Sequence, residues 1–373
     1  MIPYTRKTLP NGLTVVVNRD RASKLAAVNI LYRVGARNEN PARTGFAHLF
    51  EHLMFRGTRA VENFDLPVQM ASGDNNAFTN NDYTDFYITL PKDNLETALW
   101  LESDRMEGLD ITPAKLEAEK KVVIEEFRQR YLNQPYGDQT MLLRALAYKV
   151  HPYRWAAIGL TTDHIAGASL EDVETFYRAH YRPSNAVLSI SADIEEERML
   201  ELAEKWFAPL ADHPAEAARI PQEPVQTEAR REEVERDVPA PTVTVAYHMG
   251  GRTDADFYTA DLVSDLLSGG DSGRLYTHLV KERRLLSSVN AYVTGDVDPG
   301  LFVFTGQLLP GVTPEEAETA FREEIETLQT ASAAAREIEK VKNKFEANTL
   351  FGELNVMNKA MNLGFYEMLG DLA

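Results

Sequence analysis

The sequence predicts an α+β protein built from two homologous domains. Its 373 residues are too many for one ordinary hydrophobic core. Short β-branched runs typical of strands are interspersed with amphipathic stretches typical of helices. In addition, residues 243–252, VTVAYHMGGR, repeat the pattern of residues 28–37, VNILYRVGAR. This internal repeat indicates that the second domain is a copy of the first.

Within the first copy, strands and helices follow one another along the chain. A turn at Asn11-Gly12 lies inside the first extended segment, and Gly and Asn mark further turns between the later segments. The predicted strands cover residues 7–20, 27–37, 73–79, 85–90 and 185–191, and the predicted helices cover 44–57, 95–107, 113–131 and 170–180.

Residues 209–236 have the composition of a linker, with four prolines followed by a run of charged residues. We therefore expect domains at 1–208 and 237–373, the second opening with a strand at 243–252 and a helix at 260–269. The chain ends at Ala373 in helical sequence, before any counterpart of residues 170–191. The second copy is thus expected to be incomplete at its C-terminus.

The net charge of −18 argues against nucleic acid as a partner, because a phosphate backbone requires clustered Lys and Arg. The charge is compatible with solubility alone or with attraction of basic peptides. No apolar run is long enough to span a bilayer, and residues 1–6 lack the apolar core of a signal peptide. We expect a soluble protein of the cytoplasm or periplasm.

A candidate metal site lies in the predicted helix at 44–57, with Thr44 as the expected N-cap and Gly57 just past the end. His48 and His52 are four residues apart, so both imidazoles project from one face, with Glu51 beside them. This H-x-x-E-H arrangement is the inverted form of a common zinc-peptidase motif. Because the chain has no Cys, zinc must be held by His and carboxylate ligands.

A third ligand is expected from the helix at 113–131, where Glu119 and Glu126 fall on an otherwise apolar stripe. A carboxylate on such a stripe needs a metal or a partner, so Glu126 is the favoured ligand and Glu119 the acceptor for a ligand imidazole. Helical geometry leaves Glu125 as the alternative ligand. In the second copy the matching positions carry no such set, since they read Val263, Leu266, Leu267, Glu337 and Lys344.

Taken together, these motifs resemble the pitrilysin-type inverted-zincin metallopeptidases, in particular the subgroup that includes mitochondrial processing peptidase. Other segments that carry the resemblance are Leu9-Pro-Asn-Gly-Leu-Thr-Val15, Phe55-Arg-Gly-Thr58, His151-Pro-Tyr153 and Tyr181-Arg-Pro-Ser-Asn185. The resemblance implies one zinc ion per chain, held by His48, His52 and Glu126, with Glu51 as the base and Glu119 behind a ligand.

The same resemblance implies a bacterial source. It also implies that each domain is a mostly antiparallel sheet with helices packed on one side. Two such chains or halves would enclose a peptide chamber. The segment Asn76-Ala77-Phe78 matches the family strand that pairs with the substrate backbone, although Asn76 by itself can be read as a turn residue.

One position pair departs from the family pattern. Active members carry an Arg and a Tyr that hold the substrate carbonyl, and Val280 and Ser287 occupy those positions here. Arg283 or Arg284 could replace the missing Arg. Two chains in this family can divide the work, which leads us to expect a zinc endopeptidase subunit in a heterodimer with a homologous partner carrying the Arg/Tyr pair. The alternatives are a non-catalytic, peptide-holding subunit and a self-sufficient homodimer.

Overall fold

The structure is a computed structural model that describes residues 2–213 and 219–370. Its contacts divide the chain into two compact units, and the predicted α+β class is confirmed. Unit 1 comprises Met1–Gln134, Tyr148–Thr227 and Gly352–Ala373, and unit 2 comprises Pro135–Ala147 and Glu228–Phe351. The domains predicted from sequence are contiguous, whereas each of these units takes in a segment from the other half of the chain.

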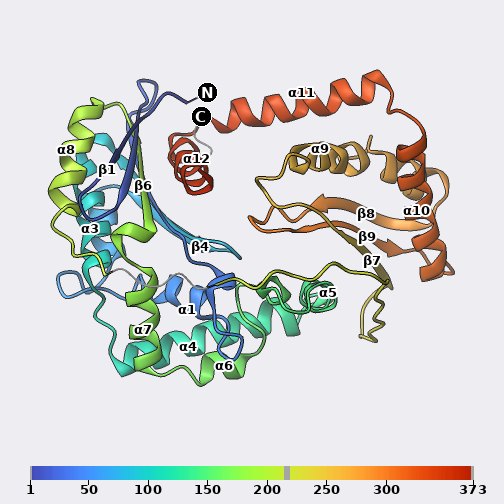
Figure 1. Cartoon of the computed structure of the whole chain (residues 1–373), viewed down its shortest axis with the longest axis horizontal. Helices are drawn as coiled ribbons and strands as arrows, with labels where there is room; N and C mark the ends of the chain where they lie inside the picture. The colour runs from blue at the N-terminus through green and yellow to red at the C-terminus, as the bar shows by residue number, and fades with distance from the viewer. Residues whose placement is uncertain (1, 214–218, 371–373) are drawn as a thin grey trace. The chain divides into compact units, whose positions relative to one another are not determined.

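Unit 1 contains a six-stranded sheet in the order β1-β2-β6-β3-β5-β4 (Figure 1). Only β2 and β6 pair in parallel, and every other neighbouring pair is antiparallel. In spatial order the strands are β1 (Thr5–Thr8), β2 (Thr14–Arg19), β6 (Ala186–Ala192), β3 (Leu25–Tyr32), β5 (Thr84–Pro91) and β4 (Asp74–Thr79). The strand β4, which carries Asn76, Ala77 and Phe78, is therefore an edge strand.

Alternate residues of each strand point to opposite faces of the sheet. Helices pack against both faces. Helices α3 (Leu95–Glu107) and α8 (Glu196–Phe207) contact β3 and β2 on one face. On the other face lies α12 (Val356–Leu369), which comes from the C-terminal end of the chain (Figure 1). Gly364 of α12 faces Asn29 and Ser189 of the strands, both of which are fully buried. The N-terminal half thus places its helices on one side, as predicted, and the C-terminal helix covers the other.

The remaining helices of unit 1 are grouped around α1 (Phe46–Leu53), which contacts α4, α7 and β4. Phe50 of α1 stacks on Phe176 of α7 with 5.2 Å between ring centroids. These helices are α2 (Asp65–Met70), α4 (Pro113–Phe127), α6 (Thr162–Ala166) and α7 (Leu170–His180). Helix α4 continues into one π-helical turn, Arg128–Leu132, a feature that is common near functional sites.

The ends of α1 differ from the prediction. Gly45, with φ of +88°, is the N-cap residue, and the helix ends at Leu53, well before Gly57. The prediction of Thr44 as N-cap is wrong because its hydroxyl is engaged elsewhere: it accepts a hydrogen bond from the Leu160 amide at 2.8 Å.

Unit 2 contains a three-stranded antiparallel sheet in the order β7-β9-β8. The strands are β7 (Thr242–His248), β9 (Leu301–Leu308) and β8 (Leu286–Val293), and the helices are α5 (Gln139–Ala147), α9 (Phe257–Ser268), α10 (Pro314–Thr330) and α11 (Ala335–Gly352). Strand β7 and helix α9 lie where the sequence repeat placed a strand and a helix. Helix α5 joins this unit through Gln139, which donates to Thr305 of β9 at 3.1 Å.

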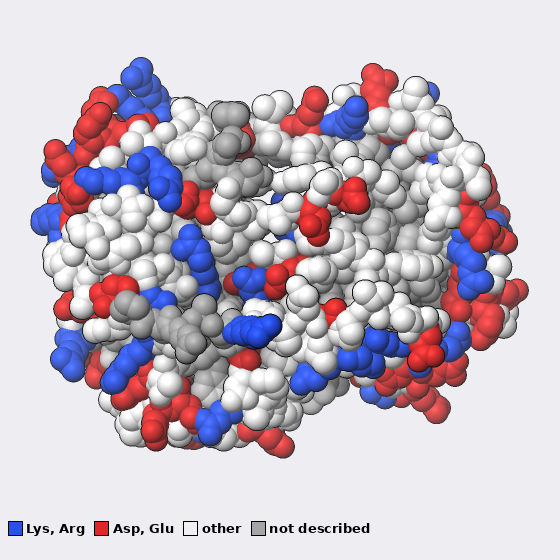
Figure 2. Space-filling model, viewed as in Figure 1, with Lys and Arg blue, Asp and Glu red and all other residues white. Residues whose placement is uncertain are grey.

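Lys and Arg side chains are interspersed with Asp and Glu on the face shown in Figure 2. Among the described helices, none is both long and apolar enough to cross a membrane.

The close approach of α12 to the sheet generates a prediction for Gly364. A Cβ at this position would lie 2.7 Å from Ser189 Oγ and 2.8 Å from Asn29 Oδ1. Replacing Gly364 with Val should therefore lower the free energy of unfolding by about 1–3 kcal/mol through overpacking. Gly108→Val is the control, because a Cβ there meets nothing within 4 Å. Urea denaturation measures both; equal midpoints for the two variants would contradict the prediction.

Candidate metal centre

Helices α1 and α4 bring two imidazoles and one carboxylate together in unit 1. His48 Nε2 lies 3.7 Å and His52 Nε2 lies 3.3 Å from the same Glu126 oxygen, Oε2. The ring centroids of His48 and His52 are 4.9 Å apart, as expected for residues one helical turn apart, and the rings are inclined at 76°. In the part of the chain that the structure describes, these three residues form the only group of its kind, with ligand atoms all within 4.8 Å of one another.

Glu119 lies on the far side of His52. Its Oε2 is 3.5 Å from His52 Nδ1, and its Oε1 is 2.5 Å from a guanidinium nitrogen of Arg56. The Glu119 side chain is only 1% exposed, so its charge needs both partners. Because Nδ1 of His52 is turned toward Glu119, Nε2 is directed to Glu126 and the imidazole orientation is fixed.

Glu126 and Glu125 point in different directions, as expected for adjacent helical residues. The Glu126 side chain is 19% exposed and faces the histidines, and its second oxygen, Oε1, pairs with Arg130 at 3.0 Å. Glu125 is 54% exposed and pairs with Arg128 at 3.6 Å, away from the imidazoles. Of the two candidate ligands left open by the sequence, the structure brings only Glu126 to the histidines.

The electrostatics of the cluster favour a positive charge between these groups. Burial lowers the pKa of His48 to about 4, so this imidazole is neutral and its lone pair is available. Burial also acts to lower the pKa of His52, but the hydrogen bonds to Glu119 and Glu126 outweigh it and raise that pKa to about 9. The hydrogen bond from His52 lowers the pKa of Glu126. A proton on His52 or a metal ion can supply the charge that the two carboxylates require.

The donor set fits a zinc ion. Zinc bonds of about 2.1 Å in a tetrahedron put neighbouring ligand atoms roughly 3.4 Å apart. The separations of 3.3 and 3.7 Å between the imidazole nitrogens and Glu126 Oε2 lie close to that value. Two His and one carboxylate are a known ligand set for catalytic zinc, which keeps its fourth position open.

Glu51 lies on the same helix, between the histidines in sequence and beside the edge strand. It accepts a hydrogen bond from the hydroxyl of Thr79, the last residue of β4, and burial raises the pKa of its carboxyl group. Asn76 is exposed on β4, and Ala77 and Phe78 follow it toward Thr79. Among the described strands, β4 pairs only with β5. The outer backbone edge of β4 therefore ends beside the carboxylate of Glu51.

The two positions that depart from the family pattern lie in unit 2. Val280 is in a π-helical segment, Tyr276–Glu282, and packs against the hydrophobic core of that unit. Ser287 is exposed at the start of β8 and its hydroxyl donates to Gln307 Oε1 at 3.1 Å. Nearby Arg283 pairs with Glu323 at 2.6 Å.

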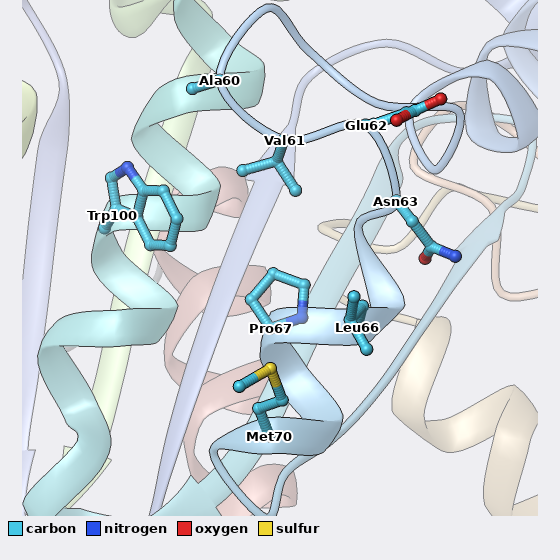
Figure 3. A pocket seen from close by; sticks show the side chains of 8 residues that line it. All are labelled: Ala60, Val61, Glu62, Asn63, Leu66, Pro67, Met70 and Trp100. Atoms are coloured by element: carbon cyan, nitrogen blue, oxygen red, sulfur yellow. The ribbon is translucent and has the colours of Figure 1, made fainter.

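An open pocket of about 650 Å³ lies elsewhere in unit 1, between α2 and α3 (Figure 3). Its lining is largely apolar, and Glu62 is its one ionisable residue. It contains none of the clustered histidines or carboxylates, so we do not assign the chemistry to it. The lining residues are Ala60, Val61, Glu62, Asn63, Leu66, Pro67, Met70 and Trp100.

Three side chains around the cluster were not predicted from the sequence. Arg56 is four residues after His52, the last residue of the motif, and Thr79 is the last residue of β4. Arg130 is four residues after Glu126, a spacing at which opposite charges meet on a helix. That spacing was the available signal for Arg130, whereas the contacts of Arg56 and Thr79 depend on how α1 meets α4 and β4.

The chain is similar to proteins of one known family. The family model described as insulinase, peptidase family M16, matches residues 14–156, and the model described as the peptidase M16 inactive domain matches residues 167–345. The zinc protease PqqE of Helicobacter pylori is 32% identical over 341 residues, which cover 90% of this chain and 77% of that protein. The chain therefore belongs to the M16 family of peptidases.

A solved structure and a second curated protein extend the comparison. The crystal structure of a protease from Helicobacter pylori matches with a TM-score of 0.93 and 30% identity, covering 100% of this chain and 91% of the other. The probable mitochondrial-processing peptidase subunit beta of Arabidopsis thaliana is 25% identical over 315 residues, 80% of this chain and 59% of that protein. The predicted family is thus confirmed, and the names of its members support a zinc-dependent peptidase.

The choice between the two adjacent carboxylates can be tested by metal analysis. Glu126→Gln should lower the zinc affinity by more than the roughly 10- to 100-fold that loss of an outer hydrogen bond costs, because a ligand itself is removed. Glu125→Gln makes the same chemical change one residue away on an exposed side chain and should leave zinc binding unchanged. Zinc content after dialysis measures both. Loss of zinc from the Glu125 variant alone would show that the assignment is reversed.

Proposed function

We propose that this chain is the zinc-bearing subunit of an endopeptidase that cleaves extended or unfolded peptides. The observation that carries the proposal is the convergence of His48, His52 and Glu126 beside Glu51 and an unpaired strand edge. The names of the relatives support zinc and proteolysis. In this proposal residues 1–208 form the catalytic domain, 209–236 the linker and 237–373 the homologous domain without metal.

His48, His52 and Glu126 hold the metal ion in this proposal. Glu119, itself paired with Arg56, orients His52, and Arg130 holds the Glu126 oxygen that faces away from the imidazoles. A bound zinc ion supplies Lewis acidity, which polarises the scissile carbonyl and makes water more acidic.

Glu51 serves as the general base and acid. It is one residue from His52 on the same short helix, so its carboxylate lies at the same end of the site. The burial that raises its pKa makes it a better proton acceptor than an exposed carboxylate. Glu51 accepts a proton from the attacking water and delivers it to the leaving amine. Thr79 donates a hydrogen bond to this carboxylate and restricts its orientation.

The outer edge of β4, which pairs with no second strand among the described residues, accounts for peptide binding in the proposal. A peptide added beside Asn76, Ala77 and Phe78 would extend the sheet and hydrogen-bond through its backbone. Such binding requires an extended substrate and is largely independent of its side chains. It would also lead the peptide backbone toward Glu51, since β4 ends at Thr79.

Val280 and Ser287 are the reason to include a partner chain. A valine packed in a core and an exposed serine cannot replace Arg and Tyr as donors to a developing oxyanion, a loss worth roughly 3 kcal/mol where it has been measured. We propose that a homologous subunit supplies these donors and closes the chamber. A relative named as a subunit, the mitochondrial-processing peptidase subunit beta, supports this division. The same two positions favour a second candidate function, a peptide-holding subunit without useful catalysis.

The role of Glu51 can be separated from metal binding. Glu51→Gln should keep zinc bound, because no ligand is changed, and should lower the rate of peptide cleavage by about 10²–10⁴-fold through loss of the proton acceptor. Cleavage of an unfolded peptide and zinc content are measured on the same preparation. Cleavage at the wild-type rate would rule out Glu51 as the base.

If a homologous subunit supplies the Arg/Tyr pair, this chain alone should bind zinc but cleave peptides slowly. Addition of a homologous chain that carries the Arg/Tyr pair should raise the rate by about 10²–10³-fold, the value of one oxyanion donor or more. Full activity of this chain alone would instead support a self-sufficient homodimer. Zinc binding without cleavage in either sample would support the peptide-holding function.

A further inference from the structure

The helix that carries the motif has no side-chain cap of its own. Gly45 occupies the N-cap position with φ of +88°. A Cβ at Gly45 would lie 2.6 Å from the Ile158 carbonyl oxygen and 2.7 Å from Ile165 Cδ1, so a capping side chain cannot be placed there. The hydroxyl of Thr44 accepts from Leu160 instead. The first amides of α1 therefore need an acceptor from outside the helix.

Glu39 provides that acceptor, although it lies six residues before Gly45 and eight before Ala47. Its Oε2 accepts from the Gly45 amide and its Oε1 from the Ala47 amide, each at 2.9 Å. Trp155 Nε1 donates to the same Oε2 at 3.1 Å and to the Ala36 carbonyl at 3.1 Å. Glu39 is 6% exposed and Trp155 is 1% exposed. Both carboxylate oxygens thus only accept hydrogen bonds, and the side chain is fixed on both sides.

The position of this contact matters for the candidate metal site. Helix α1 has eight residues, too few to be stable without outside contacts. His48 comes directly after Ala47, whose amide Glu39 holds, and Glu51 follows within the next turn. Burial raises the pKa of the Glu39 carboxyl group to about 8, and the hydrogen bonds from the Ala47 and Gly45 amides act against that rise. A shift of this first turn would move His48 relative to Glu126, which stands on a different helix.

We infer that Glu39 is a positioning residue for the metal centre, acting as a distant cap that fixes the first turn of α1. Glu39 does not touch the metal ligands or the substrate edge. It acts through the backbone of Gly45 and Ala47. The inference rests on the proposed zinc site for its effect on metal binding, and on the hydrogen bonds alone for its effect on the helix.

The test compares two isosteric changes. In Glu39→Gln one oxygen becomes an amide NH₂, which cannot accept a hydrogen bond from a backbone amide. Glu223→Gln is the control in unit 1. Glu39 accepts from two backbone amides and one indole N–H, and Glu223 accepts from three backbone amides, those of Lys149, Val150 and His151 at 2.7–2.9 Å. Competition with a chromophoric chelator measures the zinc affinity of each apo protein, and urea denaturation measures its stability.

We expect Glu39→Gln to bind zinc about 10- to 100-fold more weakly than wild type, the range for lost outer-shell orientation. It should also have a lower kcat at saturating zinc. Glu223→Gln should keep both values even if it loses a similar amount of stability. Equal zinc affinity in wild type and Glu39→Gln, or an equal loss in both variants, would overturn the inference.

A second measurement tests the inference without depending on Glu39→Gln being folded or on the wild type binding zinc. Glu39→Asp keeps the carboxyl group but shortens the side chain, so it cannot reach both amides. Hydrogen–deuterium exchange of residues 44–53 should be faster in this variant than in wild type, without added metal, while exchange in α8 is unchanged. Unchanged exchange in 44–53 would reject the cap. Absence of zinc from the wild type would reject the proposed function but leave this readout valid.

Discussion

The burial of carboxylates at the contact between α1 and α4 is the constraint on which the site depends. Glu119 is almost completely shielded from water, and an uncompensated charge there would cost several kcal/mol. His52 and Arg56 compensate it, and in doing so they fix the direction of the imidazole. Glu126 is held in turn between the two histidines and Arg130. Each charged group is therefore both stabilised and oriented by its neighbours, which is the condition for a preorganised metal centre.

The sheet of unit 1 connects this centre to a surface suited to peptides. Strand β4 lies at the edge of the sheet, and its last residue, Thr79, hydrogen-bonds to Glu51. Helix α12 covers the face of the sheet that α3 and α8 leave open. Its Gly364 permits a close approach to Asn29 and Ser189. The strand edge is consequently part of a sheet packed on both faces, and it ends at the proposed base.

The second unit shows how the same pattern is satisfied without a metal. Leu266 and Leu267 occupy the positions of Glu51 and His52 and are buried. Lys344 replaces Glu126 and pairs with Asp265 at 2.7 Å, while Glu337 replaces Glu119 and pairs with Arg274 at 2.7 Å. Apolar packing and ordinary ion pairs have taken over from the ligand set. Among the described residues, the candidate metal cluster is thus confined to the first copy.

The sequence by itself determined the fold class, the repeat and the spacing of the site residues, because these follow from helical and strand periods. Residues four apart lie on one face of a helix, as His48 and His52 do. Residues seven apart also share a face, as Glu119 and Glu126 do. Tertiary structure decided between the two adjacent carboxylates, because it brings the favoured Glu126 to the histidines while Glu125 pairs with Arg128. It also decided that Glu39, rather than Thr44, caps α1, and which unit α5 and α12 join. Contacts between segments distant in sequence have no local period, so no pattern within one segment could indicate them.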